Sequence, residues 1–149
     1  QRLALKGEVV VADATAWRPE GPADAVLLDA PCSATGTARR HPDVPHLKRP
    51  DDLVGLTALQ DALLTAAGTM VRPRGLLVYA VCSLEPEEGR ERIRSFLGRD
   101  SGWERVPITA DEIGGYAGAI SAEGDLRTLP GNGPEGGWDG FYACRLRRR

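Results

Sequence analysis

Two cysteines stand just after short apolar runs, where a thiol could act as a nucleophile. Cys32 comes shortly after the run 25–28, and Cys82 directly follows the run 76–81. A free cysteine is often only a small buried hydrophobe, and we expect this of Cys144, which lies within an apolar stretch. Cys32 and Cys82 instead each begin a turn. The thiolate is the reactive form of cysteine, so both are candidates for covalent catalysis.

Two aspartates occupy similar positions. Asp29 ends the run 25–28, and Asp13 ends the β-branched run 8–12. An aspartate at a strand end often only caps a turn, so each has a structural explanation beside a functional one. Ligands of open α/β sheets bind outside the carboxyl ends of the strands. If 25–28 and 76–81 are neighbouring strands, Asp29 and both thiols meet at one cleft.

Short apolar runs predict the strands that position these groups. Residues 8–12, 25–28 and 76–81 each form such a run, and the last two are typical of strands buried on both faces. Residues 126–129 and 141–146 predict two more strands, which can form an antiparallel hairpin at the sheet edge. Strands and helices alternate along the chain. We therefore expect an α/β fold with a mostly parallel sheet and an antiparallel edge strand.

The clearest helix is predicted over 51–71. Its leucines and alanines recur at three and four residues, and Asp51 or Asp52 can cap its start. The apolar face is expected at Leu53, Leu56, Leu59, Leu63, Leu64 and Ala67. Residues 30–50 have no periodicity and contain several prolines, which predicts a long irregular loop of the functional or disordered kind.

A second helix is predicted to start at 85–88, where a proline and acidic residues suit a first turn. We expect the positive end of this helix to favour the thiolate of Cys82. Weaker helical signals are a capping box at 109–112 and a helix end at 1–5.

Composition and charge exclude several classes of protein. The chain has 149 residues, 42% of them hydrophobic and 27% charged, which is typical of one soluble globular domain. No apolar run is long enough to cross a bilayer, and the N-terminus shows no signal peptide. Three cysteines without paired spacing argue against a disulfide scaffold, and two histidines in one loop argue against zinc. We expect a cytoplasmic monomer with no metal and no membrane.

Basic residues gather in one segment although the net charge is −2. A local basic patch can hold phosphate groups even on an acidic protein. A solvated loop explains the same pattern equally well. The candidates are Arg39, Arg40, His41, Lys48 and Arg49.

Two motifs, DAPCSATGT at 29–37 and VYAVCSLEPEE at 78–88, resemble those of one family. It is the NOP/Sun (RsmB-like) family of RNA (cytosine-5) methyltransferases, and the resemblance is to the C-terminal part of the catalytic domain. Residues 39–43, 59–60 and 139–142 support the resemblance in the same order. The resemblance implies an S-adenosylmethionine-dependent methyltransferase (Rossmann-like) fold and RNA, ribosomal or transfer, as the partner.

The resemblance also implies roles for individual residues. In this family the cysteine matching Cys82 attacks carbon 6 of a cytosine, so that carbon 5 can take a methyl group from S-adenosylmethionine. The cysteine matching Cys32 assists release of the product. The aspartate matching Asp29 contacts the base and, together with that matching Asp13, the cofactor. The basic residues at 39–49 become candidates for the RNA backbone.

The sequence departs from the family pattern in three places, one of them His46, where an aromatic residue is common in the family. Val81 stands where the family usually has threonine, and we expect this change to tune the reaction rather than abolish it. The family's glycine-rich cofactor loop precedes the matched region. We therefore expect residues 1–149 to be one N-terminally truncated, partial catalytic domain that binds cofactor poorly and is marginally stable.

Three other functions stay open from the residues. A DNA cytosine-5 methyltransferase would use Cys32 as its nucleophile and leave the motif around Cys82 unexplained. A catalytically silent RNA-binding remnant fits the missing cofactor loop. A thiol redox protein would need a resolving cysteine close to an exposed thiolate.

Overall fold

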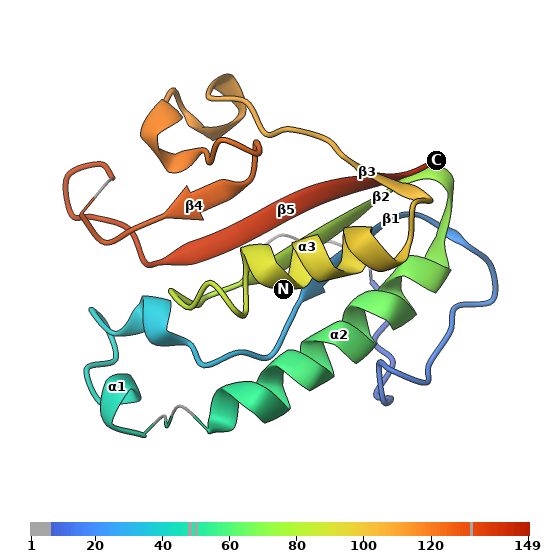
Figure 1. The fold of residues 1–149 in the computed structure, drawn as a ribbon, viewed down its shortest axis with the longest axis horizontal. Helices are drawn as coiled ribbons and strands as arrows, with labels where there is room; N and C mark the ends of the chain where they lie inside the picture. Colours follow the sequence, from blue (N-terminus) through green and yellow to red (C-terminus); the bar gives the residue numbers. More distant parts are fainter. Residues whose placement is uncertain (1–6, 48, 50, 132) are drawn as a thin grey trace.

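Five strands form one mixed sheet in the computed structural model, which describes residues 7–47, 49, 51–131 and 133–149 (Figure 1). The strands are β1 (Ala23–Asp29), β2 (Val71–Val81), β3 (Trp103–Arg105), β4 (Leu126–Thr128) and β5 (Phe141–Arg148). Their order is β1-β2-β5-β3, and β4 also pairs with β5. β1 and β2 are parallel, whereas β5 is antiparallel to β2, β3 and β4. The predicted α/β fold class and the antiparallel strands at one edge are confirmed.

Two helices, α2 (Asp52–Met70) and α3 (Arg90–Arg99), pack on one face of the sheet (Figure 1). A short helix, α1 (Val44–Leu47), and three 3-10 turns lie in the loops; the turns are Thr35–Thr37, Asp111–Ile113 and Ala117–Ala119. The two long helices bury alternate residues of β2 and β5, because successive side chains of a strand point to opposite faces. These strand residues are Leu77, Tyr79, Val81, Tyr142, Cys144 and Leu146.

The predicted strand at 8–12 is wrong. Residues 7–12 form no strand, and the side chains of Val9 and Val11 are 88% and 98% exposed. A strand exists only where a neighbour satisfies its backbone hydrogen bonds. No described segment pairs with residues 7–12. These β-branched residues therefore have no neighbouring strand to bond with.

The prediction that β1 is buried on both faces is also wrong. β1 lies at an edge of the described sheet and pairs only with β2. Its Val26 and Leu28 pack against the core, but Leu27 on the other face is 72% exposed. The continuous apolar run therefore predicts the strand correctly, but it does not show that both faces of the strand are buried.

The second helix begins later than predicted. Residues 86–89 form a turn, and α3 starts only at Arg90, after Gly89 in a non-helical conformation. The stripe Ile93, Phe96 and Leu97 faces the core as expected. Since Cys82 does not stand at the start of a helix, the expected support of its thiolate by a helix N-terminus is not present.

The first helix agrees with its prediction in extent but not in every contact. Asp51 makes no capping hydrogen bond, and Asp52 instead accepts one from the backbone N–H of Arg49 (2.9 Å). Leu59 is 40% exposed, while the polar Gln60 beside it is fully buried. The length and hydropathy of α2 would also suit a membrane span; one third of that span is buried, and its buried residues pack on β1, β2 and α3.

Four smaller predictions remain, and two of them fall on residues that the structure describes. The described residues between 30 and 49 are largely irregular, as expected. In the predicted capping box, Thr109 donates its N–H and hydroxyl to Glu112 (2.9 and 3.0 Å), and Gly114 with φ +73° ends the turn. The helix end at 1–5 and the candidate Lys48 lie outside the described residues.

Candidate active site at the ends of β1 and β2

The thiols of Cys32 and Cys82 are in contact. Their sulfur atoms lie 3.5 Å apart, and both residues are half-buried. The third cysteine, Cys144, is fully buried in β5, where burial raises the pKa of its thiol. The prediction that the loops after β1 and β2 bring two thiols together is confirmed, and so is the structural role expected of Cys144.

The two thiols of the pair do not share the same environment. Burial raises the pKa of Cys32 to about 12, against a backbone hydrogen bond at Ala34 that lowers it. The neighbouring Cys82 and Glu88 raise it further. Cys32 therefore keeps its proton at neutral pH, and its S–H can donate to the sulfur of Cys82.

Backbone hydrogen bonds join the two thiol loops. Ala30 N–H donates to the carbonyl of Ala80 (2.9 Å), which extends the parallel pairing of β1 and β2. Beyond the strands, Gly36 N–H donates to the carbonyl of Cys82 (3.1 Å). Gly36 also lies so close to Gly140 that a Cβ at position 36 would be 1.9 Å from the Gly140 carbonyl oxygen. Only glycine fits at position 36, where the Cys32 loop passes the segment before β5.

A buried carboxylate that the sequence analysis did not select lies beneath the thiols. Glu88 is fully buried and accepts hydrogen bonds from the hydroxyls of Ser33 (2.5 Å) and Ser83 (2.6 Å). It also accepts from the Ser33 N–H (2.9 Å) and from Gln60 Nε2 (3.0 Å). Ser33 and Ser83 each follow one of the cysteines. This repeated Cys-Ser pair, together with a glutamate inside the matched motif, is the signal that could have identified Glu88.

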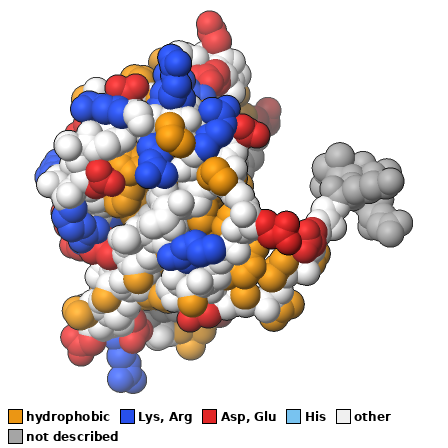
Figure 2. All heavy atoms as spheres, turned by 90° about the vertical axis from the view of Figure 1, so that its right-hand side faces the viewer, with side chains coloured by type: hydrophobic (Ala, Val, Ile, Leu, Met, Phe, Trp, Pro, Cys, Tyr) orange, Lys and Arg blue, Asp and Glu red, His pale blue; other side chains and the backbone are white. Residues whose placement is uncertain are grey.

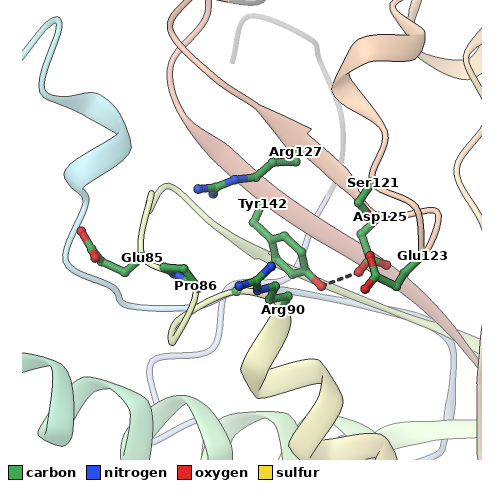
Figure 3. A pocket seen from close by; sticks show the side chains of 9 residues that line it. Glu85, Pro86, Arg90, Ser121, Glu123, Asp125, Arg127 and Tyr142 are labelled. Atoms are coloured by element: carbon green, nitrogen blue, oxygen red, sulfur yellow. Dashed lines mark hydrogen bonds between the residues drawn. The ribbon is translucent and has the colours of Figure 1, made fainter.

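A cavity of about 210 Å³ lies beside the loop that follows Cys82 (Figure 3). Arg127 lines it and donates to the carbonyls of Ser83 (2.8 Å) and Leu84 (2.7 Å). On its other side the hydroxyl of Tyr142 donates to the buried carboxylate of Asp125 (2.6 Å), as Figure 3 shows. Arg127 therefore holds the loop after Cys82 from the side of the cavity, in addition to the hydrogen bond from Gly36.

The two candidate aspartates lie on the surface. Asp29 ends β1 opposite Ala80 of β2, and its side chain is exposed. Asp13 is exposed in a turn, where hydrogen bonds from the hydroxyl (2.7 Å) and N–H (2.9 Å) of Thr15 lower its pKa. Carboxylates suit the hydroxyl groups of a nucleoside, so their chemistry fits S-adenosylmethionine. Neither carboxylate is in a buried setting that would keep water away.

The candidate basic residues are only partly brought together. Arg40 pairs with Asp139, which raises the pKa of the guanidinium and lowers that of the carboxyl. Arg39 lies 3.7 Å from the same carboxylate and donates to the carbonyl of Gly136 (2.5 Å). Both arginines line an open groove of about 470 Å³ with the apolar residues Leu126, Trp138, Phe141 and Ala143. His41 and Arg49 are exposed in the same loop region.

A second group of arginines lies at the other end of the sheet. Figure 2 shows basic side chains on the face of the molecule where the chain ends. A hollow there is lined by Arg74, Glu104, Arg147, Arg148 and Arg149. Arg74 lies near the start of β2 and Cys82 just beyond its end, so this group is remote from the thiols.

Comparison with known proteins places these features in one family. Residues 1–147 match the family model described as 16S rRNA methyltransferase RsmB/F. Ribosomal RNA small subunit methyltransferase B from Vibrio cholerae is 40% identical over the whole chain, and that from Xylella fastidiosa is 43% identical over 97% of it. The chain spans 32% of the length of each relative, which is about a third, and corresponds to their C-terminal part.

Solved structures agree with this fold. A methyltransferase homologue from Pyrococcus horikoshii superposes with a TM-score of 0.63 at 28% identity, covering 87% of this chain and 40% of that one. NSun6 from the same organism, solved with SFG, superposes with a TM-score of 0.77 over 95% of this chain and 34% of that one. At 24% identity the second likeness concerns the fold alone.

Proposed function

The chain belongs to the RsmB/F family of 16S rRNA methyltransferases, and from this premise we propose that its protein methylates carbon 5 of a cytosine in RNA. Ribosomal RNA is the proposed substrate, because the relatives are named for the small ribosomal subunit. The methyl donor in the proposal is S-adenosylmethionine, in keeping with the expected fold type and the solved relative with its analogue SFG.

The contact between Cys32 and Cys82 is the observation that carries the proposal. The two sulfurs lie 3.5 Å apart, and burial raises the pKa of Cys32. In the proposal Cys32 therefore keeps its proton, and its contact partner Cys82 acts as the nucleophile, as in the family that the motif at 78–88 resembles. The alternative in which Cys32 attacks uses the same contact, and separate substitution of the two cysteines distinguishes the two versions.

The proposed reaction follows from these assignments. The Cys82 thiolate adds to carbon 6, forming a sulfur–carbon bond and leaving electron density on carbon 5. Asp29 lies beside the end of β2 and would hold a proton at the pyrimidine nitrogen. After methyl transfer, water takes the proton from carbon 5, the electrons of that carbon–hydrogen bond form the carbon 5–carbon 6 double bond, and Cys82 leaves as a thiolate. The S–H of Cys32 then stabilises the departing sulfur through a hydrogen bond.

The cofactor enters this scheme only as a methyl donor. When bound, S-adenosylmethionine supplies an electrophilic methyl group. Asp13 and Asp29 are the proposed contacts to its hydroxyl groups, on the basis of their chemistry and exposure. In the proposal, the described residues near the thiols position the nucleophile.

The wider setting is also part of the proposal. We infer a monomer in the bacterial cytoplasm that binds RNA without a metal or a membrane. Bacterial relatives and free thiols support the compartment. Arg39, Arg40, His41, Lys48 and Arg49 are the proposed contacts to the RNA backbone, and the groove beside Arg39 and Arg40 supports the first two.

Trapping a covalent adduct on RNA that carries 5-fluorocytosine tests the proposal. The chain would be grafted into the Vibrio cholerae relative in place of the segment that it matches. Cys82→Ala should abolish the adduct, whereas Cys32→Ala should still form it and release product slowly. Cys144→Ala is the control, because that thiol is fully buried away from the pair.

Other outcomes would contradict it. An adduct that survives Cys82→Ala but not Cys32→Ala would reverse the two roles. A parent protein that binds RNA but never transfers a methyl group would favour the silent RNA-binding function. Rapid, reversible oxidation of the pair without any adduct would favour the redox function, since two thiols in contact also suit a dithiol switch.

A further inference from the structure

We propose that Glu88 is a positioning residue whose buried carboxylate holds the loops of Cys32 and Cys82 so that their sulfur atoms stay in contact. The proposed role in catalysis rests on the function proposed above. The geometric role does not, and it can be tested without RNA or cofactor.

The two thiol loops meet on the same carboxylate. The hydroxyls of Ser33 and Ser83, each one residue after a cysteine, donate to the same oxygen of Glu88 at 2.5 and 2.6 Å. The two hydroxyl oxygens are also only 3.1 Å apart. A shift of either loop would therefore break a bond to Glu88, so the carboxylate couples the position of one cysteine to that of the other.

Glu88 is itself fixed from two sides. The buried hydroxyl of Tyr79 donates to the Glu88 carbonyl (2.6 Å), which ties its backbone to the middle of β2. Gln60 of α2 donates from Nε2 to the carboxylate (3.0 Å) and to the carbonyl of Pro31 (2.9 Å). The core helix, the strand and both loops thus share one network.

Only a carboxylate suits this network. Its recorded side-chain contacts are four donor groups on two oxygens: the N–H and hydroxyl of Ser33, the hydroxyl of Ser83 and the amide of Gln60. A glutamine at position 88 would replace one acceptor oxygen by an NH₂ that points at donors. Burying a carboxylate is costly unless donors surround it, and here they do.

An exposed glutamate in the same turn offers a matched control. Glu87 is the preceding residue and its side chain is exposed. Glu87→Gln removes the same charge from the same turn without touching the network. Cys144→Ala serves as the background for all variants, so that only the paired thiols remain.

Phenylarsine oxide is the probe, because its arsenic binds two sulfurs that lie close together. One reagent molecule reacts with both thiols, forms two arsenic–sulfur bonds and releases one water, with no change of oxidation state. We expect tight binding by the background protein and by Glu87→Gln. Glu88→Gln should weaken binding about tenfold, since small displacements of reacting groups have large effects. Ser83→Ala should weaken it less, because Ser33 still holds the carboxylate.

The outcomes separate positioning from simple stabilisation. Circular dichroism and thermal melting would show whether each variant is folded. Folded Glu88→Gln with unchanged arsenic affinity would overturn the proposal, as would a background protein that does not bind the reagent. If Glu88→Gln does not fold, Ser33→Ala with Ser83→Ala decides: weakened binding supports the proposal and unchanged binding overturns it.

A kinetic measurement then links the position to catalysis. In the grafted enzyme, Glu88→Gln should lower kcat for adduct formation about tenfold and leave KM unchanged, because Glu88 contacts no substrate. If arsenic binding changes as expected but no variant ever forms an adduct, the positioning role stands and the proposed function fails.

Discussion

Glu88 and Asp29 are two carboxylates near the ends of the same pair of strands, yet their surroundings are opposite. Glu88 is fully buried and surrounded by donors from both thiol loops and from α2. Asp29 is exposed at the end of an edge strand. The two regions differ in the same way: the thiol loops are closely packed, whereas the outer side of β1 and residues 7–13 are open to solvent.

This difference indicates which half of the proposed reaction the described residues support. The nucleophile needs an exact position relative to the second thiol, and a buried hydrogen-bonded network provides it. The methyl donor would rest on Asp13 and Asp29, which are exposed. We call the thiol loops with Glu88 the nucleophile side of the proposed site, and Asp13 with Asp29 the donor side. The described residues form the nucleophile side more completely than the donor side.

The largest expected effect separates the two carboxylates directly. Glu88→Ala leaves buried donors of Ser33, Ser83 and Gln60 without an acceptor and should lower the free energy of unfolding by about 3 kcal/mol or more. Asp29→Ala, at an exposed site, should change it by about 0.5 kcal/mol or less. Urea unfolding of both variants measures this. Equal effects would remove the contrast between the two regions.

The next prediction compares two glycines. Gly36→Ala places a Cβ 1.9 Å from the carbonyl oxygen of Gly140 and should destabilise the fold by about 2 kcal/mol through overpacking. Gly21→Ala meets nothing within 4 Å and should be close to neutral. Thermal melting of both proteins is the measurement. A neutral Gly36→Ala would show that the contact between the Cys32 loop and the segment before β5 is looser than the structure indicates.

Elements whose evidence lies within one segment could be predicted from the sequence. The apolar runs located β1, β2, β4 and β5, and helical periodicity located α2, because each pattern lies within one segment. The strand at 8–12 failed because a strand depends on a neighbour that no pattern within the segment reveals. The three-residue β3 is too short to show a period.

For the same reason the sequence predicts some residues of the candidate site and misses others. Cys32 and Cys82 could be paired because both follow strands that are neighbours in a parallel sheet. Glu88 was interpreted as a charge at a helix start, since acidic residues beside a proline suit that position. Its partners Ser33 and Gln60 lie on other segments, and only the repeated Cys-Ser pair could have indicated that Ser83, five residues before Glu88, is a partner too.

A smaller effect is expected at the groove beside the thiol loops. Arg40→Gln should weaken binding of single-stranded RNA about threefold at low salt and reduce the salt dependence, if Arg40 contacts a phosphate. Arg72→Gln is the control, because Arg72 also pairs with an aspartate, Asp24, but near the start of β2. Fluorescence anisotropy across a salt series measures both. Equal losses would assign the effect to net charge rather than to this groove.

The smallest expected effect concerns the methyl donor, and it tests the open side of the comparison. If Asp13 and Asp29 are the main contacts and both stay exposed, S-adenosylmethionine should bind residues 1–149 with a Kd of about 1 mM or weaker. At 1 mM donor, binding of that strength adds only about 0.4 kcal/mol, which raises Tm by less than about 2 °C. Calorimetric titration and melting with and without the donor measure this, and S-adenosylmethionine on the grafted enzyme gives the positive control. Micromolar binding by the chain alone would mean that exposed carboxylates at an edge strand suffice to hold the donor, and the contrast between a closed nucleophile side and an open donor side would no longer hold.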